Sequence, residues 1–245
     1  MHRTIRVFDD LESMSVAAAA AVSELVAGST GRFSIALSGG GTPRRLYELL
    51  ADDHAGIDWK KVHLFWGDER FVPAGDPSSN FGSASEALLD RIEIPDANIH
   101  KIAVDVPTAV EAAANYEGNL TDFFGIRRPG FPVFDLILLG LGDDGHTASI
   151  FPGDPVIDER ERWLVAVTAP AGIEASERIT LTLPVINAAK NIFFLVSGES
   201  KADALHEMLF AGPSASEGYP AAMVFPDGPL VWFIDRDAYG AASSL

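Results

Sequence analysis

The chain contains no cysteine. Disulfide bonds, thiolate metal ligands and a cysteine nucleophile are therefore excluded together. No apolar run approaches the roughly 20 residues that a membrane span requires, and the arginine-containing start lacks the uninterrupted apolar segment of a signal peptide. These absences predict a soluble, cytoplasmic protein with no membrane partner.

Basic residues are scarce. Lysine and arginine number 18 against 35 aspartates and glutamates, which gives a formal net charge of −17. Because such a field repels the phosphate backbone, we expect no nucleic-acid partner. An anionic small molecule would need a few local cations to bind. The 47% of hydrophobic residues, spread over 245 positions, are enough for a sizeable core.

Internal repeats and Pro/Gly linkers are also absent, so the sequence predicts a single domain over residues 1–245. Short β-rich runs alternate with helical stretches, which favours an α/β fold with a mainly parallel sheet flanked by helices. The predicted strands are Phe33–Leu37, Val62–Trp66, Phe134–Leu139, Trp163–Thr168, Ile179–Leu183, Ile192–Val196 and Leu230–Ile234, the last of which closes the sheet. The predicted helices run from the Asp10 cap to Ala27, from near Pro43, over Asn80–Arg91, over Thr108–Phe124 and over Lys201–Phe210.

Four predicted strands are each followed at once by a polar loop that contains glycine. These loops span residues 38–42, 67–70, 140–146 and 197–201. In open α/β sheets, ligands bind beyond the carboxyl ends of the strands. If the four strands run parallel, the loops meet at one site.

The first loop combines Ser38, three successive glycines (residues 39–41) and Thr42 ahead of a predicted helix. Glycines let the backbone approach a ligand closely, and the first N–H groups of a helix attract phosphate. A tight strand–helix turn is the alternative. The loop has neither the P-loop ending nor the dinucleotide-binding spacing.

His146 is the last residue of the third loop, close to Asp143 and Asp144. The stretch before it matches Gly-x-Gly-x-x-Gly, but its two carboxylates would repel a pyrophosphate. Either aspartate can orient the imidazole, which would then accept a proton from water near neutral pH. A purely structural histidine is the alternative. No second histidine lies at a metal-ligand spacing, so we expect no metal.

The second loop brings together Asp68, Glu69 and Arg70, which form either a solvated charge cluster or part of the site. Lys201 lies at the start of a predicted helix, where the helix dipole disfavours a cation. An anionic ligand at that helix end would remove the conflict.

Together these segments resemble the 6-phosphogluconolactonase family. The resemblance rests on residues 37–43, 66–73 with Ser79 and Asn80, 140–149 with 151–153, 178–182 and 197–202. It implies a Rossmann-like fold similar to that of glucosamine-6-phosphate deaminases. It also implies hydrolysis of 6-phospho-D-glucono-1,5-lactone, the second step of the oxidative pentose phosphate pathway, with no cofactor, metal or obligatory protein partner.

The resemblance also implies roles for individual residues. His146 matches the general base, Asp144 its orienting partner and Arg70 an arginine near the lactone. The expected binding residues for the sugar phosphate are Ser38, Gly39, Gly40, Gly41, Thr42, Asp68, Arg178 and Lys201.

Two rival functions share this fold. A deaminase-like isomerase is expected to carry an Asn-Glu pair shortly after Asp-Gly-His, whereas this chain has Phe151 where that carboxylate would stand. A non-catalytic sugar-phosphate sensor is expected to follow a helix-turn-helix segment and to carry a basic surface. Neither feature is found in this sequence.

Overall fold

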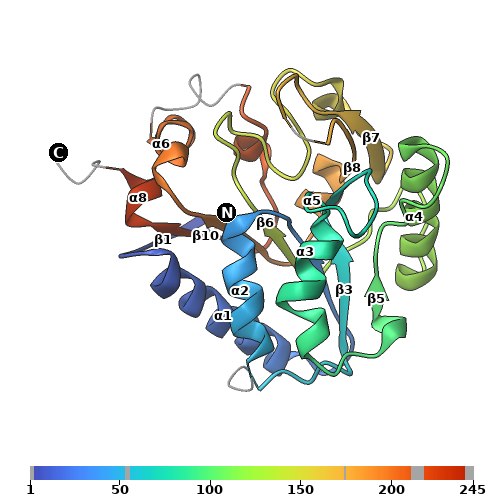
Figure 1. Cartoon of the computed structure of the whole chain (residues 1–245), viewed down its shortest axis with the longest axis horizontal. Coiled ribbons are helices and arrows are strands. Elements are labelled where there is room, and N and C mark those ends of the chain that lie inside the picture. Colours follow the sequence, from blue (N-terminus) through green and yellow to red (C-terminus); the bar gives the residue numbers. More distant parts are fainter. Residues whose placement is uncertain (1–2, 53–55, 174, 211–217, 241–245) are drawn as a thin grey trace.

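Seven strands form one parallel sheet in the order β1-β10-β9-β6-β2-β3-β5 (Figure 1). The computed structural model describes residues 3–52, 56–173, 175–210 and 218–240. The strands of this sheet are β1 (Arg3–Phe8), β2 (Phe33–Leu37), β3 (Val62–Trp66), β5 (Ile99–His100), β6 (Leu136–Leu139), β9 (Ile192–Val196) and β10 (Leu230–Asp235). Every residue of β2, β6 and β9 is buried. These mainly apolar runs, in which Ser34 is the polar residue, suit parallel strands that are covered on both faces, as the sequence predicts.

Three further strands form a separate antiparallel sheet in the order β4-β8-β7. They are β4 (Asp68–Arg70), β7 (Leu164–Thr168) and β8 (Glu177–Leu181). The sequence predicts these strands within one mainly parallel sheet, whereas the structure places β7 and β8 in a second, antiparallel sheet. Residues 169–176 connect them, and a parallel pair would need a crossover of a dozen residues or more. Leu183, expected at the end of β8, instead begins a helix.

The edge of the parallel sheet also differs from the prediction. β10 lies inside the sheet, because β1 pairs with its outer side from Arg3 opposite Leu230 to Phe8 opposite Asp235. β1 has no fully buried residue. Its polar, half-exposed pattern explains why apolar runs in the sequence do not reveal it.

Helices flank the parallel sheet, and α1, α2 and α3 lie side by side in Figure 1. The helices are α1 (Leu11–Gly28), α2 (Gly41–Ala51), α3 (Asn80–Ala87), α4 (Ala109–Phe124), α5 (Leu183–Asn187), α6 (Ala202–Phe210) and α8 (Arg236–Tyr239). Two of the predicted helices include residues that form 3₁₀ turns instead. α3 stops at Ala87 and is followed by a 3₁₀ turn over Leu89–Arg91, and Lys201 belongs to a 3₁₀ turn that precedes α6.

Helix α1 begins with a capping box, in which the Asp10 carboxylate accepts the N–H of Ser13 and the Ser13 hydroxyl accepts the N–H of Asp10. By length and composition alone, this helix is long and apolar enough to cross a membrane, which corrects the expectation that no such segment exists. Its buried side chains recur every four residues, at Met14, Ala18 and Val22, and they belong to the hydrophobic core. This periodicity is that of a helix packed on a sheet.

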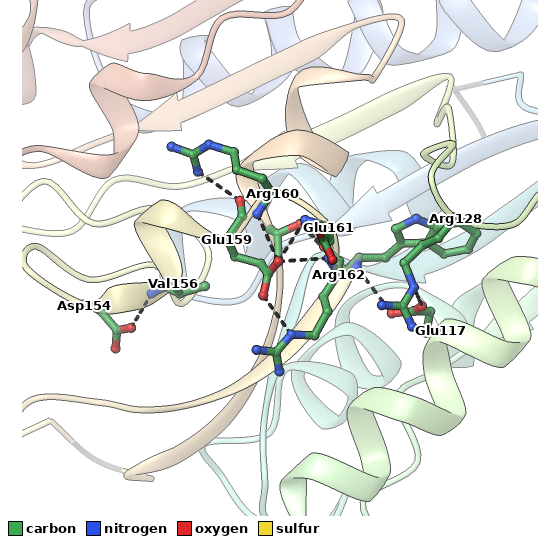
Figure 2. Close-up of polar contacts among 10 residues, drawn as sticks. Glu117, Arg128, Asp154, Val156, Glu159, Arg160, Glu161 and Arg162 are labelled. Atoms are coloured by element: carbon green, nitrogen blue, oxygen red, sulfur yellow. Dashed lines mark hydrogen bonds and ion pairs between the residues drawn. The ribbon is translucent and has the colours of Figure 1, made fainter.

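Helix α4 joins the small sheet to the rest of the molecule (Figure 1). Figure 2 shows how Glu117 of α4 holds the chain where it enters β7. One Glu117 oxygen accepts the backbone N–H of Trp163 at 3.3 Å, and the other pairs with Arg128 at 2.9 Å. Nearby, backbone N–H groups of residues 161 and 162 lower the pKa of Glu159 to about 2.

Candidate active site

A cavity of about 170 Å³ lies at the carboxyl ends of β2, β3, β6 and β9. All four predicted loops contribute to it, because the strands that carry them run parallel. Its lining residues are Ser38, Gly39 and Gly40 from the first loop, Asp68 and Arg70 from the second, Gly140, Leu141, Gly142 and His146 from the third, Lys201 from the fourth, and Asn80, Ala148 and Arg178 from elsewhere. Gly41 and Thr42 instead lie in the first turn of α2.

His146 is oriented by one neighbouring carboxylate. Its Nδ1 lies 2.6 Å from Oδ1 of Asp144, and its backbone N–H donates to the same oxygen at 3.0 Å. Burial raises the pKa of Asp144, but these hydrogen bonds outweigh burial and hold the pKa below its usual value. An ionised carboxylate can only accept, so Nδ1 of His146 is the donor in this hydrogen bond and Nε2 is the ring nitrogen that remains for a ligand or water.

The imidazole is also confined on two sides. A Cβ atom on Gly142 would lie 2.0 Å from His146 Nδ1, so this close approach requires glycine. The Phe151 ring lies 4.8 Å from the imidazole, centroid to centroid, and is fully buried. Phe151 thus contacts His146 with an aromatic ring and supplies no carboxylate.

Asp143 has a different partner from Asp144. It forms an ion pair with Lys201 and accepts the Ser200 hydroxyl at 3.1 Å. The hydrogen bond from Lys201 is the main reason why the pKa of Asp143 lies below its usual value. The ion pair joins the loop after β6 to the 3₁₀ turn after β9, and it places an ammonium group at the cavity.

Two arginines enter the cavity from the small sheet. Arg70 on β4 lies directly opposite Arg178 on β8. Arg70 donates to the carbonyl of Ser78, and Arg178 donates to the carbonyl of Ala175 at 3.1 Å. Arg178 is only 5% exposed, and both burial and the charge of Arg70 lower its pKa. Two adjacent guanidinium groups at a cavity favour an anionic ligand.

Of the two acidic residues of the second loop, Asp68 lines the cavity beside these arginines, whereas Glu69 is not among the lining residues. Asp68 accepts the Ser149 hydroxyl at 2.6 Å and the side-chain amide of Asn80 at 3.2 Å. Glu69 accepts the backbone N–H groups of Arg70, Asn80 and Phe81 at 2.7–2.8 Å. Burial raises the pKa of Glu69 to about 7, although these hydrogen bonds lower it. Glu69 therefore ties β4 to the first turn of α3.

Sequence reasoning missed Asn80 as a cavity residue. Ser79 caps α3 by accepting the N–H of Gly82, and Asn80 follows as the first residue of that helix. Asn80 does belong to the segments that carry the family resemblance, but a residue that follows a capping serine gives no indication by itself that it faces a ligand. Within the described ranges, no group of three or more His, Asp or Glu side chains is placed to hold a metal ion.

Residues 9–232 match the family model described as glucosamine-6-phosphate isomerases/6-phosphogluconolactonase. The chain belongs to this family. A curated 6-phosphogluconolactonase from Synechocystis is 44% identical over 208 residues, which cover 85% of this chain and 84% of the relative. The solved 6-phosphogluconolactonase from Trypanosoma brucei superposes with a TM-score of 0.87 at 28% identity and covers 98% of both chains.

A solved monomeric glucosamine-6-phosphate deaminase superposes with a TM-score of 0.81 at 21% identity. It covers 96% of this chain and 98% of the deaminase. At that identity the likeness concerns the fold alone. It confirms the predicted similarity to the deaminase fold, with a mainly parallel sheet flanked by helices.

Proposed function

We propose that this chain is a 6-phosphogluconolactonase that hydrolyses 6-phospho-D-glucono-1,5-lactone to 6-phospho-D-gluconate. The observation that carries the proposal is the His146–Asp144 pair, which faces the same cavity as Arg70, Arg178 and Lys201. A base and a group of cations are what hydrolysis of an anionic ester requires. The names of the similar proteins support the same activity.

In the proposed reaction, Nε2 of His146 removes a proton from a water molecule as that water attacks the lactone carbonyl. A positioned general base contributes about 10²–10⁴ in rate. Arg70 and neighbouring backbone N–H groups stabilise the oxyanion of the tetrahedral intermediate. The bond between the carbonyl carbon and the ring oxygen then breaks, and the imidazolium returns its proton to that oxygen.

The proposal places the substrate phosphate against residues 38–42, at the first turn of α2. Helix N-termini bind phosphate through unpaired N–H groups and the helix dipole. Lys201 and Arg178 supply opposite charge and offset the field of a chain with a net charge of −17. Asp68 completes the sugar-binding set. No metal, cofactor or protein partner takes part in this mechanism.

In the same proposal, the reaction is the second step of the oxidative pentose phosphate pathway, and the protein works in the cytoplasm. Phe151 beside His146 argues against the rival deaminase, because that position offers no carboxylate to assist ring opening. Ammonia release from glucosamine 6-phosphate would nevertheless be the signature of that rival.

The decisive experiment compares the wild-type protein with His146→Ala on freshly generated lactone, with EDTA present. Product formation is followed through an NADP-dependent 6-phosphogluconate dehydrogenase and corrected for spontaneous hydrolysis. We expect wild-type turnover well above the buffer rate and a loss of about 10²–10⁴ in kcat for the variant. Binding of 6-phosphogluconate, measured by calorimetry, should persist in the variant. Near-wild-type turnover in His146→Ala would remove His146 from the mechanism.

A further inference from the structure

Three buried side-chain atoms, each in a residue that lines the cavity, have no hydrogen-bond partner among the described residues. They are Ser38 Oγ, Arg70 Nε and Asn80 Oδ1. Buried polar atoms are nearly always hydrogen-bonded, because an unpaired one loses its hydration without compensation. Their convergence on one cavity points to ligand atoms as their partners. A hydroxyl can donate or accept, but the Asn80 oxygen can only accept.

The orientation of the Asn80 amide is fixed by its surroundings. Its Nδ2 donates to the backbone carbonyl of Asp68 at 2.9 Å and to the Asp68 carboxylate at 3.2 Å. A flipped amide would bring Oδ1 against these two acceptors. Oδ1 therefore faces the first loop, where a Cβ atom on Gly39 would lie only 1.7 Å from it. Asn80 itself is 2% exposed.

The acceptor is also held rigidly. The Glu69 carboxylate binds the backbone N–H of Asn80 at 2.7 Å, and Asp68 is anchored from its other side by the Ser149 hydroxyl at 2.6 Å. Glu69, Ser149 and Asp68 are all less than 5% exposed. An acceptor fixed in this way is selective, because a ligand that lacks the matching donor leaves it unpaired.

We propose that Asn80 Oδ1 accepts a hydrogen bond from one hydroxyl group of the sugar and makes Asn80 a specificity-determining residue. The inference rests on the proposed function. In the 1,5-lactone, the carbonyl oxygen, the ring oxygen and the phosphate dianion all lack a proton to donate. The hydroxyl groups on carbons 2, 3 and 4 are the donors that remain. Asn80 therefore distinguishes a sugar lactone from an otherwise similar phosphorylated ester.

The test compares the parent lactone with its 2-deoxy, 3-deoxy and 4-deoxy analogues in wild-type protein and in Asn80→Ala. In the wild type, we expect kcat/KM for one analogue to fall about 10- to 100-fold. In Asn80→Ala, kcat/KM for the parent should fall by a similar factor. The parent and that one analogue should then have similar kcat/KM values. Equal rates for all three analogues and the parent in the wild type would overturn the proposal. An undiminished penalty in a folded Asn80→Ala would also overturn it.

Ser149→Ala is the matched control, because it also releases Asp68 but leaves the Asn80 oxygen in place. In Ser149→Ala, kcat/KM for the deoxy analogue should still be about 10- to 100-fold lower than for the parent, whatever the overall rate of the variant. If it loses the penalty as Asn80→Ala does, the discrimination belongs to Asp68 and the proposal is wrong.

Failure of the proposed function gives a different pattern from failure of this inference. If the wild type does not accelerate hydrolysis of the parent lactone, the lactonase proposal fails. Calorimetry with 6-phosphogluconate and its deoxy counterparts then tests Asn80 alone. A selective loss of affinity for one deoxy compound, absent in Asn80→Ala, would support the inference, and equal affinities would overturn it.

Discussion

Two adjacent aspartates at the candidate active site have different partners. Asp144 accepts the Nδ1 proton of His146, whereas Asp143 pairs with Lys201. The sequence leaves open which of them orients the histidine, since both lie within three residues of it. The backbone decides, because the N–H of His146 also donates to Asp144 and fixes that carboxylate beside the ring. Asp143 instead forms the ion pair with Lys201.

The pairing of Lys201 with Asp143 leads to a prediction for Lys201→Ala. In the proposed function, the ammonium group exchanges its carboxylate partner for the substrate phosphate. Removing it should raise KM about tenfold or more and change kcat less, since uniform binding is lost rather than transition-state stabilisation. Initial rates in the coupled assay, measured over a range of lactone concentrations, check this prediction.

Asp203→Ala, in the first turn of α6, is a suitable control because it changes a charge near the same 3₁₀ turn outside the cavity lining. Its KM should stay close to that of the wild type. An unchanged KM in Lys201→Ala would move the phosphate site away from Lys201.

At the scale of elements, the sequence predicts the buried strands best. The bounds of β2, β3 and β9 agree with the structure to the residue, because each is a short, mainly apolar run ended by a serine or glycine. β4 consists of Asp68, Glu69 and Arg70, and it is a strand only because it pairs with β8. Such a strand depends on tertiary contacts, so local propensity does not reveal it. Asn80 lies in a predicted helix, but its place in the cavity depends on contacts with Asp68 and Glu69, which the sequence does not show.

The pairing of β3 with β5 brings His63 and His100 together at the edge of the parallel sheet. Nδ1 of His63 lies 3.1 Å from Nε2 of His100, and the Phe65 ring stacks on His100. Burial and the nearby Arg32 lower the pKa of His63, whereas burial and His63 lower the pKa of His100 to about 4. The folded state therefore favours both rings in their neutral form.

This pair predicts a loss of stability in acid. Because the folded pKa values lie below the unfolded value of about 6.5, the stabilisation is complete above pH 6.5 and declines as pH falls toward 4. Urea unfolding at pH 7.5 and pH 5, compared between the wild type and His100→Gln, isolates the contribution. The wild type should lose about 1 kcal/mol more than the variant over this interval, a value already reduced for solvent screening. Equal losses would show that the pair does not titrate with folding.

At the scale of the whole molecule, the candidate site lies where two sheets meet. His146 and Lys201 come from loops of the parallel sheet, whereas Arg70 and Arg178 come from the antiparallel one. The sequence predicts that the loops converge, but not that two of the three cavity cations belong to a second sheet. That division depends on the short connection between β7 and β8 and on the polar strand β4. The position of the small sheet thus sets the distance between base and guanidinium groups.

Glu117 of α4 helps to fix the position of the small sheet. Its carboxylate accepts the backbone N–H of Trp163 just before β7, as Figure 2 shows. Trp163 is fully buried, so in Glu117→Ala its N–H would lose a partner that water replaces poorly. We expect the free energy of unfolding in urea to fall by about 1–3 kcal/mol. Asp122→Asn, an exposed change on the same helix, should alter it by less than about 0.5 kcal/mol. Equal stabilities for the two variants would show that apolar packing of α4 holds the small sheet by itself, whereas the expected difference would assign part of that task to Glu117.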